Sequence, residues 1–316
     1  MITHMKKRNQ VRFINPDGAG LAMMNTSPHH IHFILQRIEG IGGVEANINS
    51  QKSPYQDGST FLSANLEPRD ITLRVTINAR SREELFEYRE YVQRVFYPSY
   101  GEGVLIVQQG NKSRLAHAVA ETTPVFFDYI GNQVSFVVNL VAHDPFWYHT
   151  GGGVDVFSQQ AKIQIVDVQG FYGEDLRNLP TKGTSSFSSS ITMGRTVRTI
   201  NNPGTAQSPF KLIIPSVDDF IFMKRRTGEK IELSKPLLEG ESLVVETALG
   251  NRKVSLITKD GEIVNGFDYL SRGSSFFYLD GGDNRMEFNR SYDNAGTERG
   301  GSITPRLIWE PRYVGI

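Results

Sequence analysis

The sequence of 316 residues contains no cysteine. A chain without thiols forms no disulfide framework, no cysteine-based zinc finger and no cysteine nucleophile. This composition suits a protein made in a reducing cytoplasm, although an exported protein without disulfides fits it equally well. The length is sufficient for two domains of ordinary size, each with its own core and neither dependent on a metal for stability.

The chain has no excess of charge of either sign. Lysine plus arginine number 34 and aspartate plus glutamate number 34, so the formal net charge is zero. Binding to nucleic acid depends on basic groups that displace counterions, and a balanced sum removes the simplest case for it. A local basic patch stays open, because a sum says nothing about distribution. We expect no specific nucleic-acid binding.

Long apolar runs are also missing. The longest, residues 134–142, falls far short of the roughly 20 residues that a membrane-spanning helix needs. The basic start, Lys6 to Arg8, is followed by a polar stretch rich in turn formers and not by the apolar core of a signal peptide. The sequence therefore predicts a soluble protein with no cleaved signal and no membrane contact.

Strand patterns dominate what is present. Residues 71–77 alternate apolar and polar side chains with period two, as a half-buried strand does. Residues 134–142 place apolar side chains on one face and also Val137 and Val141 on the other, which indicates burial on both sides or a subunit contact. Residues 103–108 read as another short strand.

One helix is predicted, over residues 82–96. Ser81 and Glu84 form a capping box, in which each side chain bonds the backbone N–H of the other residue. Apolar residues then recur at helical spacing, and Pro98 ends the element. An isolated helix of about four turns is only marginally stable, so it must pack on a sheet or a partner.

A domain boundary is predicted near residues 149–153. The strand at 134–142 leads into Pro145, three aromatic residues and then three consecutive glycines, Gly151 to Gly153. Glycine loses more backbone entropy on ordering than any other residue, so such a run seldom lies inside an element. We expect two domains, residues 1–149 and residues 150–316.

The second half reads as a series of short strands with regular turns, which is typical of a jelly-roll β-sandwich. Asp260-Gly261 predicts a type I′ hairpin turn, and Leu249-Gly250-Asn251 the turn before it. Residues 183–190, five of which are serine, predict a mobile loop. The predicted strands are 162–168, 196–201, 210–215, 220–224, 242–247, 253–258, 262–264, 276–279 and 285–288.

Two clusters could hold a metal. His30 and His32 would share one face of a strand, but no third ligand can be named, and histidines on a surface loop explain them as well. Asp280, Asp283 and Asn284 could surround Ca²⁺, yet their spacing departs from the EF-hand pattern. Because aspartate, asparagine and glycine are turn formers, a tight turn is the favoured interpretation. We assign no metal site.

Known catalytic motifs are missing. The glycines at residues 40–43 match neither a dinucleotide-binding nor a P-loop pattern, and no nucleophile elbow or zinc-protease motif occurs. Glu83 and Glu84 at the helix start are explained by capping. Phe146, Trp147 and Tyr148 could stack on sugars, although core packing is the favoured reading. We therefore predict no enzyme, no catalytic residue and no cofactor.

Taken together, several segments resemble the distal tail protein family of long-tailed phages of Gram-positive hosts. No single segment is specific, but their order and spacing are, and they extend over nearly the whole chain. The residues around 171–190 match the family pattern least. The segments that carry the resemblance are Ile38-Glu39-Gly40-Ile41, Tyr55-Gln56-Asp57-Gly58, Leu66-Glu67-Pro68-Arg69-Asp70-Ile71-Thr72-Leu73, the helix 82–96, Ala142-His143-Asp144-Pro145-Phe146-Trp147-Tyr148, Ile200-Asn201-Asn202-Pro203-Gly204, Pro209-Phe210-Lys211-Leu212-Ile213-Ile214, Thr227-Gly228-Glu229, Glu239-Gly240-Glu241-Ser242-Leu243-Val244-Val245, Leu279-Asp280-Gly281-Gly282-Asp283-Asn284-Arg285-Met286 and Pro311-Arg312-Tyr313-Val314-Gly315-Ile316.

The resemblance implies a structural role in the virion. It implies a mainly β protein. The N-terminal domain is expected to be a β-sandwich or belt domain with one short helix packed on it, forming a hexameric ring around a channel. The C-terminal domain is expected to be a galectin-like or carbohydrate-binding-module-like jelly-roll β-sandwich. The expected partners are copies of the chain, the tail tube protein, the tail-associated tip protein and a receptor-binding protein. Such a protein is made in the bacterial cytoplasm and ends in the tail tip.

Two other functions stay open. The chain could be a carbohydrate-binding module for cell-wall sugars, with Trp147, Trp309 or Tyr278 as stacking platforms. It could also be a wall hydrolase whose acid pair is too distant in sequence to recognise.

Overall fold

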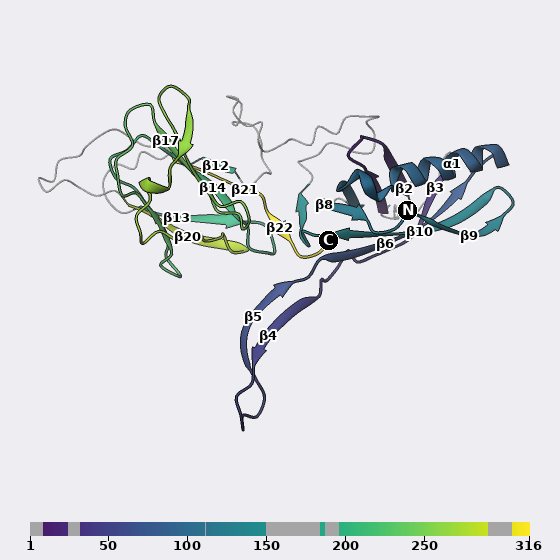
Figure 1. The fold of residues 1–316 in the computed structure, drawn as a ribbon, viewed down its shortest axis with the longest axis horizontal. Coiled ribbons are helices and arrows are strands. Elements are labelled where there is room, and N and C mark those ends of the chain that lie inside the picture. Colours follow the sequence, from purple (N-terminus) through teal and green to yellow (C-terminus); the bar gives the residue numbers. More distant parts are fainter. Residues whose placement is uncertain (1–8, 25–31, 111, 150–183, 187–195, 290–304) are drawn as a thin grey trace, which may run out of the picture. The chain divides into compact units, whose positions relative to one another are not determined.

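The computed structural model describes residues 9–24, 32–110, 112–149, 184–186, 196–289 and 305–316. The chain forms two compact units (Figure 1). One comprises the chain up to Asn178 together with Tyr313–Ile316, and the other comprises Leu179–Arg312. The predicted second domain ran to residue 316, whereas the last four residues belong to the first unit. The predicted boundary itself falls on residues 150–153, outside the described residues, and stays a prediction.

The first unit is built on one mixed sheet. Its spatial order is β22-β11-β8-β7-β1-β2-β3-β6-β10-β9. Strand β8 also pairs with β10, so that the seven strands from β8 through β10 in this order form a closed circuit. Closure leaves few unpaired edges. The strands are β1 (Asn9–Ile14), β2 (Gly20–Met24), β3 (Phe33–Glu39), β6 (Arg69–Asn78), β7 (Gly103–Gln109), β8 (Lys112–Ala120), β9 (Val125–Ile130), β10 (Gln133–Ala142), β11 (Trp147–His149) and β22 (Arg312–Tyr313).

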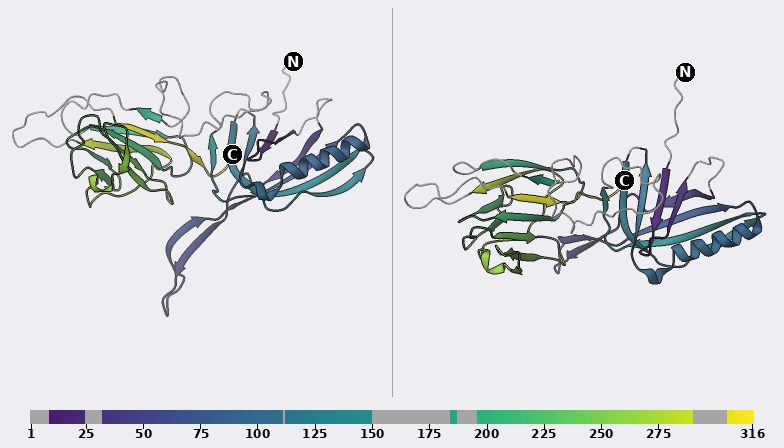
Figure 2. Two further views of the ribbon diagram at one scale, coloured as in Figure 1. Left: turned by 45° about the horizontal axis from the view of Figure 1, so that its top comes forward. Right: turned by 90° about the horizontal axis from the view of Figure 1, so that it is seen from above.

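The predicted helix is confirmed as α1 (Arg82–Val95), followed by a 3₁₀ turn, η1 (Pro98–Tyr100), and it lies along the sheet (Figure 2). The Ser81 Oγ accepts a hydrogen bond from the Glu84 N–H at 3.2 Å, as the capping box requires. The Glu84 Oε2, however, accepts from the Arg80 N–H at 2.6 Å and not from that of Ser81. This bond, followed by one from the Tyr88 hydroxyl, lowers the pKa of Glu84. The reciprocal half of the box is thus displaced by one residue.

The core of the first unit lies between the sheet and α1. The period-two pattern of β6 buries Ile71, Leu73, Val75 and Ile77, as predicted. Phe96, just after α1, stacks on Phe13 of β1 with ring centroids 4.9 Å apart.

Arg69 occupies the same face of β6 as these apolar side chains and is 2% exposed. Its guanidinium donates to the carbonyls of Pro145 at 2.9 Å, Gly40 at 2.6 Å and Gly42 at 3.0 Å, and also to the carbonyl of Val314. Burial lowers the pKa of Arg69 to about 10, which leaves the group charged at neutral pH. One side chain therefore joins three segments, including the C-terminal tail.

Two strands of the first unit leave the body as a separate two-stranded sheet, β4 (Ala46–Gln51) and β5 (Thr60–Leu66). This hairpin, which we call the arm, projects away from the ten-stranded sheet (Figure 1). The strand patterns had not predicted it, because asparagine and serine, which make up five of its thirteen strand residues, lie among its apolar residues.

The second unit is a sandwich of two sheets around its own core, which confirms the predicted class. One sheet has the order β12-β21-β14-β17-β18-β19 and the other β13-β20-β15-β16. The strands are β12 (Thr184–Ser186), β13 (Thr196–Asn202), β14 (Phe210–Pro215), β15 (Ile221–Lys224), β16 (Lys230–Glu232), β17 (Ser242–Glu246), β18 (Lys253–Ile257), β19 (Ile263–Asn265), β20 (Gly282–Asn289) and β21 (Arg306–Trp309), with a 3₁₀ turn η4 (Phe267–Tyr269).

Three local predictions for this unit need correction. The turn between β18 and β19 is not type I′, because Gly261 has a φ of 82° while Asp260 does not have a positive φ. Residues 276–279 do not form the predicted strand and make only an isolated bridge, Leu279 to Ser208. The predicted strand 285–288 begins earlier, at Gly282, and as β20 it pairs with β13 and β15. Within the predicted mobile loop 183–190, Thr184–Ser186 forms a strand; the rest of it, and the predicted strand 162–168, lie outside the described residues.

Replacing Arg69 by methionine should leave its buried carbonyl partners without a hydrogen-bond donor, and each such carbonyl costs about 1–3 kcal/mol of stability. We expect Arg69→Met to lower the free energy of unfolding of the first unit by about 3 kcal/mol. Urea denaturation followed by Trp147 fluorescence, in a Trp309→Phe background, measures it. The control Arg37→Met removes an exposed pair with Glu39 and should cost under about 0.5 kcal/mol. Equal effects of the two substitutions would contradict the stabilising role of the hydrogen bonds from Arg69 to the carbonyls.

Candidate assembly surfaces

Only one residue of the histidine pair lies in the part of the chain that the structure describes. His30 lies outside the described residues, and the His32 Nδ1 lies 3.3 Å from the Asn78 carbonyl, with its ring against Tyr88. Within the described ranges, no group of three potential ligands is close enough to hold a metal.

The segment at residues 280–284 is a hydrogen-bonded turn tied to basic side chains. The Asp280 carboxylate lies 2.9 Å from the Lys224 Nζ and 3.3 Å from an Arg226 nitrogen, and hydrogen bonds from Lys224 and Gln207 lower its pKa against the opposing effect of burial. The buried Asn284 amide donates to the Asp280 carbonyl at 2.8 Å and accepts from the Asp280 N–H at 2.8 Å. A carboxylate already neutralised by two cations is a poor ligand for Ca²⁺.

Of the three aromatic residues considered as sugar platforms, the two tryptophans are used for packing and the tyrosine is half-buried. Trp147 is 0% exposed and Trp309 is 6% exposed, so neither offers a ring face to a ligand. The Tyr278 hydroxyl accepts a hydrogen bond from the Leu249 N–H at 3.1 Å. The reading of Trp147 as a core plug is confirmed, and the Arg69 guanidinium lies 5.4 Å from its ring.

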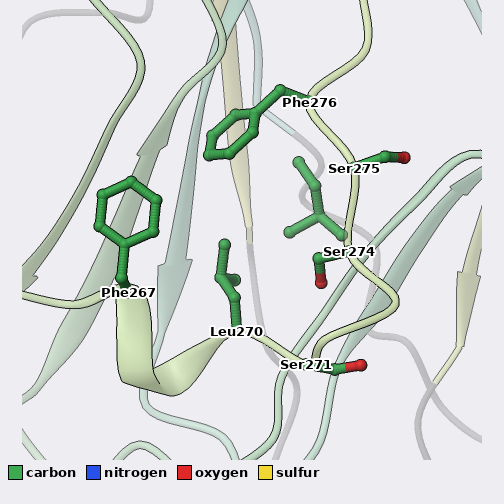
Figure 3. Close-up of a pocket in the computed structure, with 7 residues that line it drawn as sticks. Phe267, Leu270, Ser271, Ser274, Ser275 and Phe276 are labelled. Atoms are coloured by element: carbon green, nitrogen blue, oxygen red, sulfur yellow. The ribbon is translucent and has the colours of Figure 1, made fainter.

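A small pocket opens in the second unit between η4 and the chain that follows it (Figure 3). Its volume is roughly 160 Å³, below the usual 300–1,000 Å³ of ligand pockets. Two of its hydroxyls are occupied: Ser271 Oγ donates to the Glu232 carboxylate, and Ser274 Oγ donates to the Glu232 carbonyl. The pocket is therefore a weak candidate for saccharide binding. Its lining residues are Ile231, Phe267, Leu270, Ser271, Ser274, Ser275 and Phe276.

The arm presents an apolar face with nothing of its own to cover it. Opposite pairs in its register place Ala46 with Leu66 and Ile48 with Ala64 on one face, while the other face carries asparagine, serine and threonine. Every residue of β4 and β5 is exposed, including Ile48 at 63% and Phe61 at 64%. An isolated two-stranded hairpin is marginally stable in water. The arm thus has the character of a contact surface.

A second surface is the face of β6 and β10 turned away from the core. Two of the directly opposed pairs on it are uncharged and polar: Thr76 with Ser135, whose hydroxyls lie 2.9 Å apart, and Thr72 with Asn139 at 3.0 Å. The same face also carries Arg74 and Asp70, each opposite a valine. Val137, predicted to be covered on this face, is half-buried opposite Arg74. The expected doubly apolar strand is therefore a mixed ladder of valine, hydroxyl and amide side chains.

Two protein-family models match the chain. Residues 24–142 match the phage tail protein RIFT-related domain, and residues 203–300 match the C-terminal domain of the siphovirus-type tail component. The two matches are consecutive, fall in separate structural units and together span about two thirds of the chain. The chain belongs to the distal tail proteins of siphophages. It is accordingly a structural component of the phage tail, and the resemblance noted in its sequence is confirmed.

Solved structures agree with the fold of a distal tail protein. The crystal structure of SPP1 Dit, described as a paradigm of the hub adsorption apparatus in phages that infect Gram-positive bacteria, matches with a TM-score of 0.58 and 10% identity, over 89% of this chain and 93% of that one. Structures of the phage p2 baseplate in its activated conformation, with Ca and with Sr, match with TM-scores of 0.43 and 0.39, at 11% and 12% identity, over 98% and 96% of this chain and 100% and 98% of theirs. Matches with TM-scores this low add nothing further about the fold. No curated protein matches the sequence.

The tail protein's described helices include none that is long and apolar enough to cross a membrane.

The turn at residues 280–284 gives a testable distinction between a structural and a calcium-binding role. Asn284→Ala should leave the Asp280 and Gly282 carbonyls without a donor, and we expect a loss of about 2 kcal/mol in the stability of the second unit. Asn201→Ala, which removes a bond to the exposed Asp283 carboxylate, serves as the control and should cost much less. Calorimetry with and without excess calcium measures both variants. A calcium-dependent rise in the melting temperature of the wild type would overturn the turn interpretation.

Proposed function

We propose that this distal tail protein forms a hexameric ring at the tail tip, which joins the tail tube above to the tail-associated tip protein below and docks receptor-binding proteins. The observation that carries the proposal is the arm. Its apolar face is fully exposed in a single chain, and contiguous apolar surface of this kind marks an interaction site. Repetition of the chain around a closed ring would cover every arm with a neighbouring subunit.

The polar face of β6 and β10 supports the same role. A channel that DNA crosses must avoid fixed phosphate contacts, because each cation that pairs with a phosphate adds affinity. Thr72, Thr76, Ser135 and Asn139 offer no charge, and Arg74 on this face is paired with Asp128 at 3.6 Å. A face of this composition would let the polymer slide. The number six and the identity of the partners rest on the family resemblance.

The role needs no catalytic step, and we propose that the protein is not an enzyme. Two of the three platforms named for the saccharide-binding alternative, Trp147 and Trp309, are buried, and the hydroxyl of the third, Tyr278, accepts a hydrogen bond from Leu249. Synthesis in the bacterial cytoplasm followed by incorporation into the virion fits a cysteine-free structural protein.

The ring proposal predicts that assembly depends on the apolar face of the arm. We expect the wild-type chain to form hexamers, and the triple variant Ile48→Asn, Phe61→Asn, Leu66→Asn to remain a folded monomer with a cooperative unfolding transition, because these side chains are exposed in the single chain. Light scattering after size exclusion measures the mass.

The matched control changes the polar face of the same strands, as Asn47→Ser, Asn49→Ser, Asn65→Ser, and should assemble normally. A wild-type chain that stays monomeric at high concentration, even with tube protein added, would count decisively against the ring.

A further inference from the structure

A cationic side chain on the outside of the first unit is enclosed by aromatic rings. The Arg89 guanidinium lies 5.8 Å from the ring centre of Phe86 on α1, and 4.8 Å and 5.4 Å from those of Phe126 and Tyr129 on β9. We call these four residues the arginine cage. Among the described residues, the buried Arg89 Nε has no hydrogen-bond acceptor and no carboxylate lies within ion-pair distance of the guanidinium. The cage holds a cation and lacks a counterion.

A backbone irregularity completes the cage. Residues three apart on a regular strand point to opposite faces, so Phe126 and Tyr129 would not meet the same partner. Asp128 has a φ of 53°, and the pairing of β9 with β10 shifts register at this point. Phe127 consequently contacts Arg74, while Tyr129 turns to the side of Arg89. A strained residue that redirects a side chain is typical of a functional surface.

The cage is open to solvent. Phe86 is 55% exposed and Tyr129 is 56% exposed. Strand β9 is the last strand in the order of the sheet, and its final residue, Ile130, is 73% exposed. Arginine and large aromatic residues are the side chains that contribute most to protein–protein binding energy. A partner for this surface would bring a carboxylate to the guanidinium and an apolar or aromatic group to the rings.

The tip of the arm carries both groups in a fixed arrangement. Tyr55 is fully exposed with a φ of 65°, and Asp57 is the only acidic residue between β4 and β5. The Gln56 side chain braces the tip, since its Oε1 accepts from the Ser53 N–H at 3.1 Å and its Nε2 donates to the Thr60 hydroxyl at 3.2 Å. In the described part of the chain, Tyr55 and Asp128 are the only non-glycine residues with positive φ. The two strained positions belong to the two surfaces.

We propose that the arm tip of one copy docks in the arginine cage of the next copy, with the Asp57 carboxylate paired to Arg89 and Tyr55 packed on the rings of Phe86 and Tyr129. A closed ring is built from two different surfaces on each subunit, and the tip and the cage supply such a pair. The arm projects away from α1 in both figures, so that a chain's own tip does not reach its own cage (Figures 1 and 2). The contact rests on the proposed ring and specifies how its subunits recognise each other.

Charge reversal in the full-length chain tests the pairing. Asp57→Arg and Arg89→Glu should each raise the concentration for half-maximal assembly by about tenfold or more, and the double variant should restore assembly. Lys52→Glu at the same tip and Arg82→Glu on the same helix are the controls and should leave assembly unchanged. Equal single-variant effects without rescue would overturn the pairing.

The absence of native cysteine permits a direct test of proximity. Oxidation of a mixture of the single variants Tyr55→Cys and Tyr129→Cys should give covalent dimers. Each variant oxidised alone, and a mixture in which Glu87→Cys replaces Tyr129→Cys, should not. A wild-type chain that never oligomerises sinks the ring and the contact together. A wild-type ring that neither cross-links at these positions nor responds to charge reversal overturns the contact alone.

Discussion

The buried guanidinium of Arg69 is the contact on which the arrangement of the first unit depends. It lies in an apolar core, where it donates to four backbone carbonyl oxygens. These come from the chain leading into the arm, from the turn before Trp147 and from the C-terminal tail. The close packing at Gly40 has the same origin, since a Cβ there would lie 1.8 Å from the Asp70 carbonyl oxygen. The root of the arm is therefore fixed, and a contact made by its tip is pre-organised, which reduces the entropy lost on binding.

The regular elements could be predicted because their signals are local. Strand β6 alternates without interruption, and α1 combines a cap with apolar residues at helical spacing. The position of Arg69 was also informative, because it lies on the same face of the strand as Ile71, Leu73 and Val75. A charged residue on a core face requires buried hydrogen-bond partners. Those partners could not be named, because Val314 is 245 residues away in the sequence.

What escaped prediction depended on contacts beyond one chain segment. In the arm, asparagine and serine lie among the apolar residues, and this mixture is also typical of a loop. The arginine cage required the register shift at Asp128, which no pattern in the sequence of β9 reveals. The type I′ turn at Asp260-Gly261 was wrong because one glycine at positive φ is enough for a different hairpin turn, and dipeptide identity does not distinguish the two. Family resemblance supplied what periodicity could not, namely that both halves belong to one tail component.

The surfaces that make this protein unusual as a single chain become ordinary in an assembly. A monomeric protein would cover the apolar face of the arm, shorten its hairpin and neutralise Arg89 with a neighbouring carboxylate. Instead, Tyr55 and Asp128 adopt strained backbone conformations at the arm tip and in the arginine cage. Arg69 meanwhile fixes the root of the arm. Strain that stabilises nothing within the subunit is retained only if it is compensated elsewhere. The neighbouring copy in the proposed ring would provide that compensation, because it would bury the apolar face of each arm and bring a carboxylate to each Arg89.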